Sequence, residues 1–307
     1  MPEVELEIGE EAAGERLDGW LSRAVPELSR KRAKALIEAG EVFVNGRRAK
    51  KSRVLKAGDR ITLERLPRPI DFHAAADRDL DIEILLETEG YVVVDKRAGV
   101  PSHPLEEGEI GTLAGALVAR YPEMRGVGYR NREPGILHRL DTDTSGVMLA
   151  ARDQKTFDAL RRQLHAGEIE KRYLARCVGN VSAPMLIDTP IANDPRDGRK
   201  VRACKDPREV KRLNARPAST EVLRSVPALH GSLVELRANS ARRHQIRVHL
   251  ASVGHPLLGD TLYGGPRLGE PGHHLLHASS LSIGQGPTIV SDWNHADSEL
   301  FIEANEG

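Results

Sequence analysis

Residues 136–150 read Ile-Leu-His-Arg-Leu-Asp-Thr-Asp-Thr-Ser-Gly-Val-Met-Leu-Ala, and the rest of the chain is organised around them. The stretch begins with an apolar pair and ends with an apolar run, and short apolar runs bounded by turn residues are typical of buried strands. Ser145 and Gly146 favour a tight turn between the two runs. We therefore expect Asp141 on a turn between buried strands, a rigid position for a carboxylate. Many Asp side chains in turns only accept hydrogen bonds from turn amides, so position alone assigns no chemistry to this one.

Composition sets broad limits on the protein. Its 307 residues are enough for two domains, and a charged fraction of 29% is typical of a globular protein. No run of about 18 apolar residues indicates a membrane span. Six Glu and no Lys or Arg precede Arg16, so we expect residues 1–15 to be a mobile acidic leader rather than a targeting signal. Two widely spaced cysteines fit a reducing cytoplasm.

A small basic module follows the leader. Apolar spacing predicts helices over 17–24 and 30–39, the second capped by Ser29, and strands before the Asn45-Gly46 turn and over 60–66. Between Arg30 and Arg60 there are eleven basic residues and three acidic ones. Such a concentration of charge is the electrostatic footprint of phosphate-backbone binding.

A proline-containing linker over 67–79 separates this module from a larger region. Patterning there predicts a buried strand over 91–96, a helix over 112–121, and a helix capped by Asp153 and stopped by Gly167. In a strand over 169–178, Lys171 and Tyr173 share one face. A second basic segment, 199–216, is expected to be a loop or loose hairpin on RNA phosphates. A helix opening near Ser240 would place His244 and Arg247 on one face.

Three motifs resemble those of the RluA-type pseudouridine synthases. The first is His138-Arg139-Leu140-Asp141 with Thr144-Ser145-Gly146, the second is Lys171-x-Tyr173, and the third is His244-Gln245-Ile246-Arg247. Residues 16–66 resemble an S4 RNA-binding domain. The chain departs from the family pattern at Arg97, where Pro is usual, and at Ala241 and Arg243, where Gly and Thr are usual.

The resemblance implies an α+β protein with an S4 domain over 16–66 and a catalytic domain over 80–304, built on a mostly antiparallel mixed sheet flanked by helices. It implies isomerisation of uridine to pseudouridine in RNA without a metal or other cofactor. Asp141 would be the catalytic carboxylate, as a nucleophile or in a glycal route, Arg247 would keep it ionised, and Tyr173 would stack on the target base. Arg139 would fill the space that the flipped base leaves. The predicted RNA contacts are Arg139, His138, Arg30, Lys31, Arg32, Lys34, Arg47, Arg48, Lys50, Lys51, Arg242 and Lys171.

Large-subunit ribosomal RNA is the expected partner, with transfer RNA as an alternative, and we expect a monomer in the cytoplasm. A non-catalytic RNA-binding or ribosome-assembly protein on the same scaffold is a rival interpretation, although it predicts a damaged site. A hydrolase using Asp141 and Asp143 as paired carboxylates does not fit, because residues this close in a turn rarely flank a substrate. His273, His274 and His277 lack Cys or acidic neighbours at metal-binding spacing, so no metal site is predicted.

Overall fold

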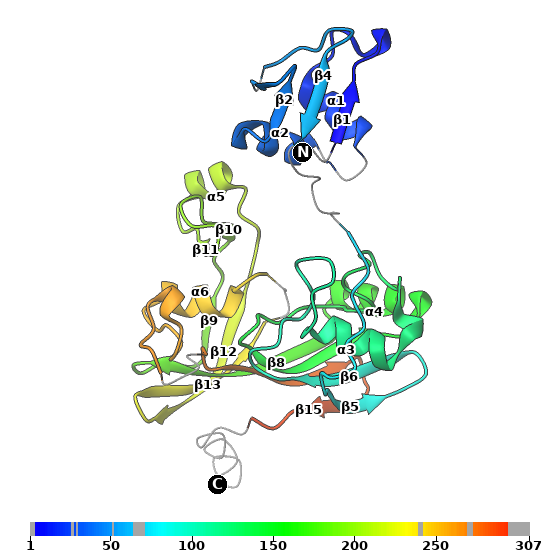
Figure 1. Ribbon diagram of the computed structural model, residues 1–307. Coiled ribbons are helices and arrows are strands. Elements are labelled where there is room, and N and C mark those ends of the chain that lie inside the picture. The colour runs from blue at the N-terminus through cyan, green and yellow to red at the C-terminus, as the bar shows by residue number, and fades with distance from the viewer. Residues whose placement is uncertain are drawn as a thin grey trace. The chain divides into compact units, whose positions relative to one another are not determined.

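A computed structural model describes residues 4–25, 28, 30–50, 52–63, 71–238, 242–268 and 273–293. The chain forms two compact units, Met1–Phe72 and His73–Gly307 (Figure 1). Each unit has its own hydrophobic core, so each is described separately.

The first unit packs two helices against a small antiparallel sheet. The helices are α1 (Leu17–Ala24) and α2 (Arg30–Ala39), and the strand order is β1-β4-β2-β3. These strands are β1 (Val4–Glu7), β2 (Val42–Val44), β3 (Arg47–Arg48) and β4 (Arg60–Leu63). The predicted helices and the Asn45-Gly46 hairpin are confirmed, with Asn45 at φ 52° in the turn. The predicted cap Ser29 lies outside the described residues.

The expectation of a mobile acidic leader is wrong for its described part. Strand β1 pairs with β4 along its whole length, from Val4 opposite Leu63 to Glu7 opposite Arg60. A short turn of helix, η1 (Glu10–Ala12), follows. Ile8 is buried in the core of this unit. The Glu side chains disguised the strand in the sequence, because Glu5 lies at the surface and pairs with Arg60 at 3.1 Å.

The second unit is built on one long twisted sheet. Its strand order is β5-β6-β7-β14-β8-β13-β12-β9, with β15 beside β14, and every pair is antiparallel except β7 with β14. The strands are β5 (Glu83–Glu87), β6 (Tyr91–Lys96), β7 (Ser145–Ala151), β8 (Ile169–Val178), β9 (Met185–Ile187), β12 (Thr220–Ala228), β13 (Gly231–Arg237), β14 (Leu276–Ile283) and β15 (Thr288–Val290). The expected α+β architecture with a mostly antiparallel mixed sheet is confirmed.

Helix α3 (Leu113–Arg120) and the short helix η2 (Pro122–Met124) share a core with Val92 and Val94 of β6 on one face of the sheet. Helix α4 (Gln154–Ala166) packs with Val93 on the opposite face. The hydroxyl of Thr112 and the carboxylate of Asp153 cap α3 and α4, accepting hydrogen bonds from the amides of Gly115 and Thr156. Gly167 ends α4 at φ 76°, as predicted. These caps satisfy amides that a helix leaves without partners inside the helix.

Three predicted elements differ from the structure. Ile136 forms only an isolated bridge with Ala150, so Asp141 precedes one buried strand, β7, rather than lying between two. The segment 199–216 contains β11 (Val201–Ala203) and a helix, α5 (Pro207–Leu213), instead of a loose hairpin. Pro207 begins α5 and the Asp206 carboxylate caps it, a start signal that the many basic residues obscured.

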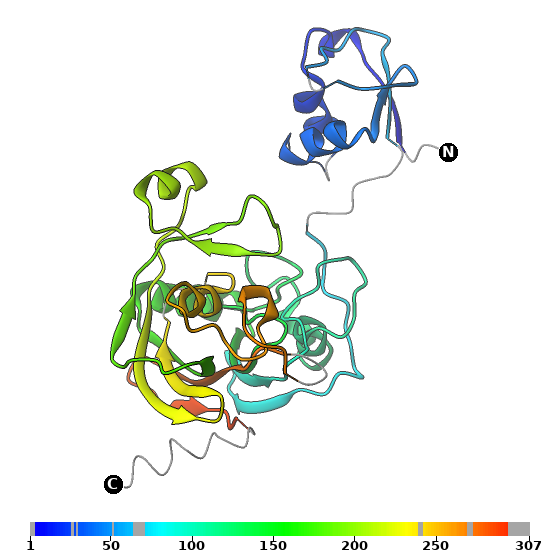
Figure 2. The same ribbon diagram turned by 90° about the vertical axis from the view of Figure 1, so that its left-hand side faces the viewer.

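The third difference concerns the helix expected from Ser240. Helix α6 (Gln245–Ser252) begins only at Gln245, because His244 takes a left-handed conformation with φ 52°. Strands β10 (Ile191–Asn193) and β11 form a hairpin that projects with α5 away from the large sheet (Figures 1 and 2). None of the described helices has the length and apolar character needed to cross a membrane.

Candidate active site

The turn that carries Asp141 is anchored from below by a buried lysine. Lys96, at the end of β6, is 1% exposed and donates hydrogen bonds to the carbonyls of Arg97, Val100 and Thr142 at 2.7–3.0 Å. Burial lowers the pKa of Lys96 to about 8, although nearby carboxylates, Asp141 first, oppose the shift. At neutral pH the ammonium therefore predominates and keeps three donors. The departure at Arg97 leaves this anchor intact, because the lysine uses only its carbonyl.

Ser102 fixes the other side of the turn. Its hydroxyl accepts a hydrogen bond from the Leu140 amide at 3.2 Å and donates one to the Leu140 carbonyl at 2.8 Å. Asp141 is thus held between two clamped neighbours, Leu140 and Thr142. Rigid support of this kind fixes a reactive group to within a fraction of an ångström, as catalysis requires.

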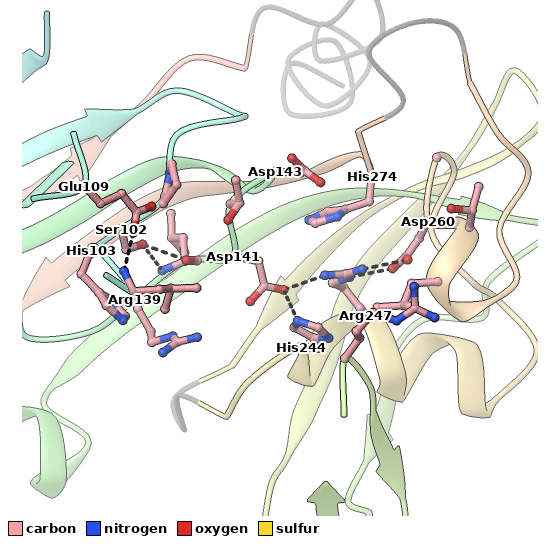
Figure 3. A pocket seen from close by; sticks show the side chains of 18 residues that line it. Ser102, His103, Glu109, Arg139, Asp141, Asp143, His244, Arg247, Asp260 and His274 are labelled. Atoms are coloured by element: carbon pink, nitrogen blue, oxygen red, sulfur yellow. Dashed lines mark hydrogen bonds and ion pairs between the residues drawn. The ribbon is translucent and has the colours of Figure 1, made fainter. Parts of the chain in front are cut away.

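Arg247 bridges two carboxylates from different segments. Its Nη1 donates to Asp141 Oδ2 at 3.0 Å, while its Nε and Nη2 donate to the two Asp260 oxygens at 2.7 and 2.9 Å. Figure 3 shows Asp141 facing the guanidinium on one side and Asp260 on the other. The side chain of Asp260 is 1% exposed and that of Asp141 is 16% exposed. Asp260 therefore orients Arg247, and Asp141 remains open to the cavity.

This arrangement keeps Asp141 ionised. Burial alone would raise the pKa of the Asp141 carboxyl, but His244 and Arg247 act in the opposite direction, and the pKa lies below its ordinary value. Of the two, Arg247 carries the permanent charge, because a guanidinium keeps its proton at physiological pH, whereas burial lowers the pKa of His244. The result is a carboxylate that is ionised at neutral pH.

His244 approaches Asp141 from the helix terminus. Its Nε2 lies 3.9 Å from Asp141 Oδ2, and its Nδ1 lies 2.9 Å from the Tyr263 hydroxyl. That hydroxyl also accepts the Val201 amide, so Tyr263 holds both the His244 ring and the start of β11. The sequence predicted His244 and Arg247 on one face, but it did not predict that Asp260 and Tyr263 meet them.

Tyr173 lines a smaller cavity, of about 50 Å³, that it shares with Asp141, Arg247 and Leu276. The larger cavity in front of Asp141 measures about 610 Å³. Burial, and then the Asp141 carboxylate, raise the pKa of the Tyr173 phenol well above its ordinary range, so the hydroxyl keeps its proton at neutral pH. The structure thus brings together the three predicted catalytic residues.

The predicted RNA contacts around this site differ in exposure. Lys171 shares a face with Tyr173 as predicted, and it is 2% exposed, so a contact with RNA would need the side chain to become accessible. Arg139 and Arg242 are exposed at the cavity that Tyr173 lines. His138 is buried, and its Nε2 accepts the Leu149 amide at 3.3 Å. All four contacts stay predictions.

Some of the basic residues predicted to contact phosphates in the first unit already form ion pairs within the protein. Arg30 and Lys34 face the buried carboxylate of Asp18 at 3.0 and 3.8 Å, which offsets part of their charge. Arg47, Arg48 and Lys50 line a concave surface of about 810 Å³ near the β2–β3 turn. Arg32 is half-buried. Lys51 and the side chain of Lys31 lie outside the described residues.

The three histidines near the C-terminal end serve separate partners. His273 pairs with Asp143 at 2.9 Å, His274 bonds to the Thr144 hydroxyl at 2.8 Å, and His277 bonds to Ser145 at 2.9 Å. Across the described ranges, no group of three or more His, Cys, Asp or Glu could hold a metal ion. His274 lines the large cavity, a position that its sequence neighbours did not indicate.

Comparisons with known proteins match both units of the chain. The family model described as RNA pseudouridylate synthase matches residues 90–252, and the S4 domain model matches residues 15–61. A protein of Aquifex aeolicus named as an RNA pseudouridine synthase is 38% identical, covering 84% of this chain and 80% of its own length. A Xanthomonas campestris protein named ribosomal large subunit pseudouridine synthase D is 36% identical, covering 84% of this chain and 74% of its own length.

Solved structures share the fold as well. The protein named human RNA Pseudouridylate Synthase Domain Containing 1 superposes with a TM-score of 0.55 at 23% identity, covering 74% of this chain and 95% of that one. At that identity the likeness concerns the fold alone. The family-model match and the two relatives together show that this chain belongs to the RNA pseudouridine synthase family and carries an S4 domain ahead of its synthase domain.

Proposed function

We propose that Asp141 is the catalytic carboxylate of this pseudouridine synthase and that its substrate is large-subunit ribosomal RNA. The observation that carries the first part is the ion pair between Asp141 and Arg247, with Asp260 behind it, at a cavity of about 610 Å³. Uridine becomes pseudouridine when the N1–C1′ bond breaks, the uracil turns, and C5 bonds to C1′. The C5 hydrogen leaves as a proton and N1 takes up a proton, so the reaction needs no redox partner.

Both chemical routes require the Asp141 anion. As a nucleophile, the carboxylate attacks C1′ and forms a covalent intermediate. In the glycal route it removes a proton at C2′ as a general base. Arg247 supports either role, because its charge holds the pKa of the Asp141 carboxyl below the ordinary value despite burial.

The target base must leave the RNA stack to reach Asp141. Enzymes that act on bases extrude them at a cost of a few kcal/mol, and stacking on an aromatic ring returns about 1–3 kcal/mol. Tyr173 is the ring that adjoins Asp141 in the smaller cavity. Arg139, exposed between the cavities, is positioned to occupy the space that the base vacates.

Ribosomal RNA is proposed on two grounds. The relatives from Xanthomonas campestris and Neisseria meningitidis are named ribosomal large subunit pseudouridine synthase D, at 36% and 33% identity. The S4 domain and its exposed basic residues Arg47, Arg48 and Lys50 add a surface for the phosphate backbone. An enzyme with this substrate would act in the cytoplasm.

Mapping pseudouridine across total RNA tests the proposal. Cells that lack the protein should lose pseudouridine at one or a few uridines of large-subunit ribosomal RNA, and the wild-type chain should restore them. The Asp141→Asn chain, expressed to the same level, should not. Loss confined to transfer RNA would contradict the proposed substrate while leaving the enzyme class standing.

A further inference from the structure

Another cavity, of about 380 Å³, adjoins the cavity of about 610 Å³ in front of Asp141, and the two share His103 and Arg139. It is called the second cavity below. Its other lining residues include Tyr129, Glu133, His138 and Arg161, none of which takes part in the chemistry described above. We propose that this cavity holds the base of a second nucleotide of the same RNA, next to the target uridine, stacked on Tyr129 with its polar edge at His138 and His103. The proposal rests on the proposed function and adds to it a site that reads the sequence around the target.

Tyr129 offers the stacking surface. Tyr129 is 70% exposed, and its ring forms a T-shaped pair with Phe157 at a centroid distance of 5.3 Å and an angle of 86°. The Arg161 guanidinium lies 5.5 Å from the Tyr129 ring centroid. Tyrosine rings and guanidinium planes are the groups on which proteins stack unpaired RNA bases. A cavity of this size is also large enough for one nucleobase.

His138 supplies a defined hydrogen-bond donor. Its Nε2 accepts the Leu149 amide, and burial lowers the pKa of the ring to about 3, so the neutral ring carries its proton on Nδ1. Among the described residues that Nδ1 is buried and has no hydrogen-bond partner. Buried polar groups in proteins are rarely left in this state, and a base carbonyl or ring nitrogen would satisfy it.

His103 adds a second polar group at the same cavity. It is 5% exposed, and neither ring nitrogen makes a hydrogen bond within the described part of the chain, although Nε2 lies 3.4 Å from Glu133 Oε1. Burial lowers the pKa of this ring to about 4, so it too is neutral and presents one donor and one acceptor. Two neutral imidazoles recognise the edge of a base better than they would a phosphate.

The charges at the cavity agree with a base rather than a phosphate at its inner end. Three guanidinium groups line it, those of Arg130, Arg139 and Arg161, and Glu133 is the opposing carboxylate. Glu133 pairs with Arg130 at 3.2 Å and lies beside His103. The net positive charge attracts the RNA strand, whereas the carboxylate beside His103 would repel a phosphate at that point.

The place of the second cavity beside Arg139 makes the nucleotide that it would hold a neighbour of the target uridine. Arg139 lines this cavity, the cavity in front of Asp141, and the cavity shared with Tyr173. An RNA strand that delivers one base to Asp141 and is parted by Arg139 would therefore meet the second cavity with the adjacent or next nucleotide. The arrangement would let the enzyme choose among uridines by the base beside them.

The test combines changes in the protein with changes in the RNA. Fragments of large-subunit ribosomal RNA that crosslink to the wild-type chain are synthesised with a single abasic nucleotide at each position near the target. Affinity for the full-length chain is measured for the wild type, for Tyr129→Leu, which keeps apolar contact with Phe157, and for Arg162→Ala. Arg162 is the matched control, because it is an exposed arginine next to Arg161 that does not line the cavity.

At one position near the target, the abasic change should weaken wild-type binding about 5- to 150-fold, equal to about 1–3 kcal/mol. Tyr129→Leu should weaken binding of the intact fragment by a similar factor. Tyr129→Leu combined with the abasic change should weaken binding no more than either change alone. When Arg162→Ala is combined with the abasic change, the factors by which each weakens binding should multiply. Effects of Tyr129→Leu that multiply with the abasic change at every position would overturn the proposal. A wild-type chain that binds a fragment but forms no pseudouridine in it would instead contradict the proposed function, and the binding comparison would still decide the second site.

Discussion

Arg247 sets the charge state of Asp141, and removing it should therefore change how activity depends on pH. In Arg247→Gln, burial is no longer opposed by a guanidinium, so the pKa of the Asp141 carboxyl should rise. The acid limb of the pH–rate profile should move to higher pH with it, because a larger fraction of Asp141 is protonated at each pH. Single-turnover rates from pH 4 to 8 measure this, and an unmoved acid limb would contradict the role given to Arg247.

Tyr173 can contribute its ring, its hydroxyl, or both. The pKa of the phenol is raised, so the hydroxyl stays protonated and can donate a proton or a hydrogen bond. We expect Tyr173→Phe to form product slowly or to stall after the glycosidic bond breaks, whereas Tyr173→Ala should also lose about 1–3 kcal/mol of base stacking. Rapid-quench analysis of RNA from both variants separates the outcomes. Near-normal product from Tyr173→Phe would leave the residue with stacking alone.

The sequence was sufficient to predict Asp141, Tyr173 and Arg247 as one site, because each lies in a short motif. It could not identify Asp260 as the second partner of Arg247, because that contact depends on how η3 (Thr261–Tyr263) packs beside α6. It also could not show that Lys171 is buried, since a strand pattern tells which residues share a face but not that the face is covered.

Among the elements, the parallel contact between β7 and β14 depends on Gly146. This residue has φ 109°, and a Cβ on it would lie 2.2 Å from the Ala278 carbonyl oxygen. Gly146→Ala should therefore lower the unfolding temperature markedly, because the clash involves backbone on both sides. Gly126→Ala is the control, with φ 84° and open space around its Cβ, and it should cost only about 1 kcal/mol. Equal losses in thermal unfolding would argue against the close strand contact as the cause.

Element boundaries show where local patterning is sufficient. Helix α4 was predictable at both ends, because the Asp153 cap and Gly167 are local signals. The start of α6 was not predictable. His244 takes a left-handed conformation there, and its ring contacts Tyr263, which comes from a distant segment of the chain. The tight turn expected at Ser145 and Gly146 is instead the start of β7, and the glycine is required by the neighbouring strand rather than by a turn.

In the whole molecule, the two units should be separable. Each has its own core, so a chain lacking residues 1–72 should fold and keep its rate at saturating RNA, because Asp141, Tyr173 and Arg247 lie in the second unit. Its affinity for ribosomal RNA should fall and its salt dependence should flatten, the logarithmic slope changing by about 0.7 for each single-strand phosphate that the shortened chain no longer neutralises. Binding measured across a salt series tests this. An unchanged slope would assign the phosphate contacts to the second unit, where segment 199–216 is the best candidate.

The most direct test of the central claim compares two neighbouring carboxylates in one assay. Asp143 lies two residues from Asp141 but is more exposed and pairs with His273 at 2.9 Å. Pseudouridine formation by purified Asp141→Asn should fall at least about a thousandfold, equal to about 4 kcal/mol of barrier, while RNA binding is retained. Asp143→Asn should stay within about tenfold of the wild type. An Asp141→Asn protein within about tenfold of the wild type, or an equal loss in both variants, would contradict the assignment of Asp141 as the catalytic residue.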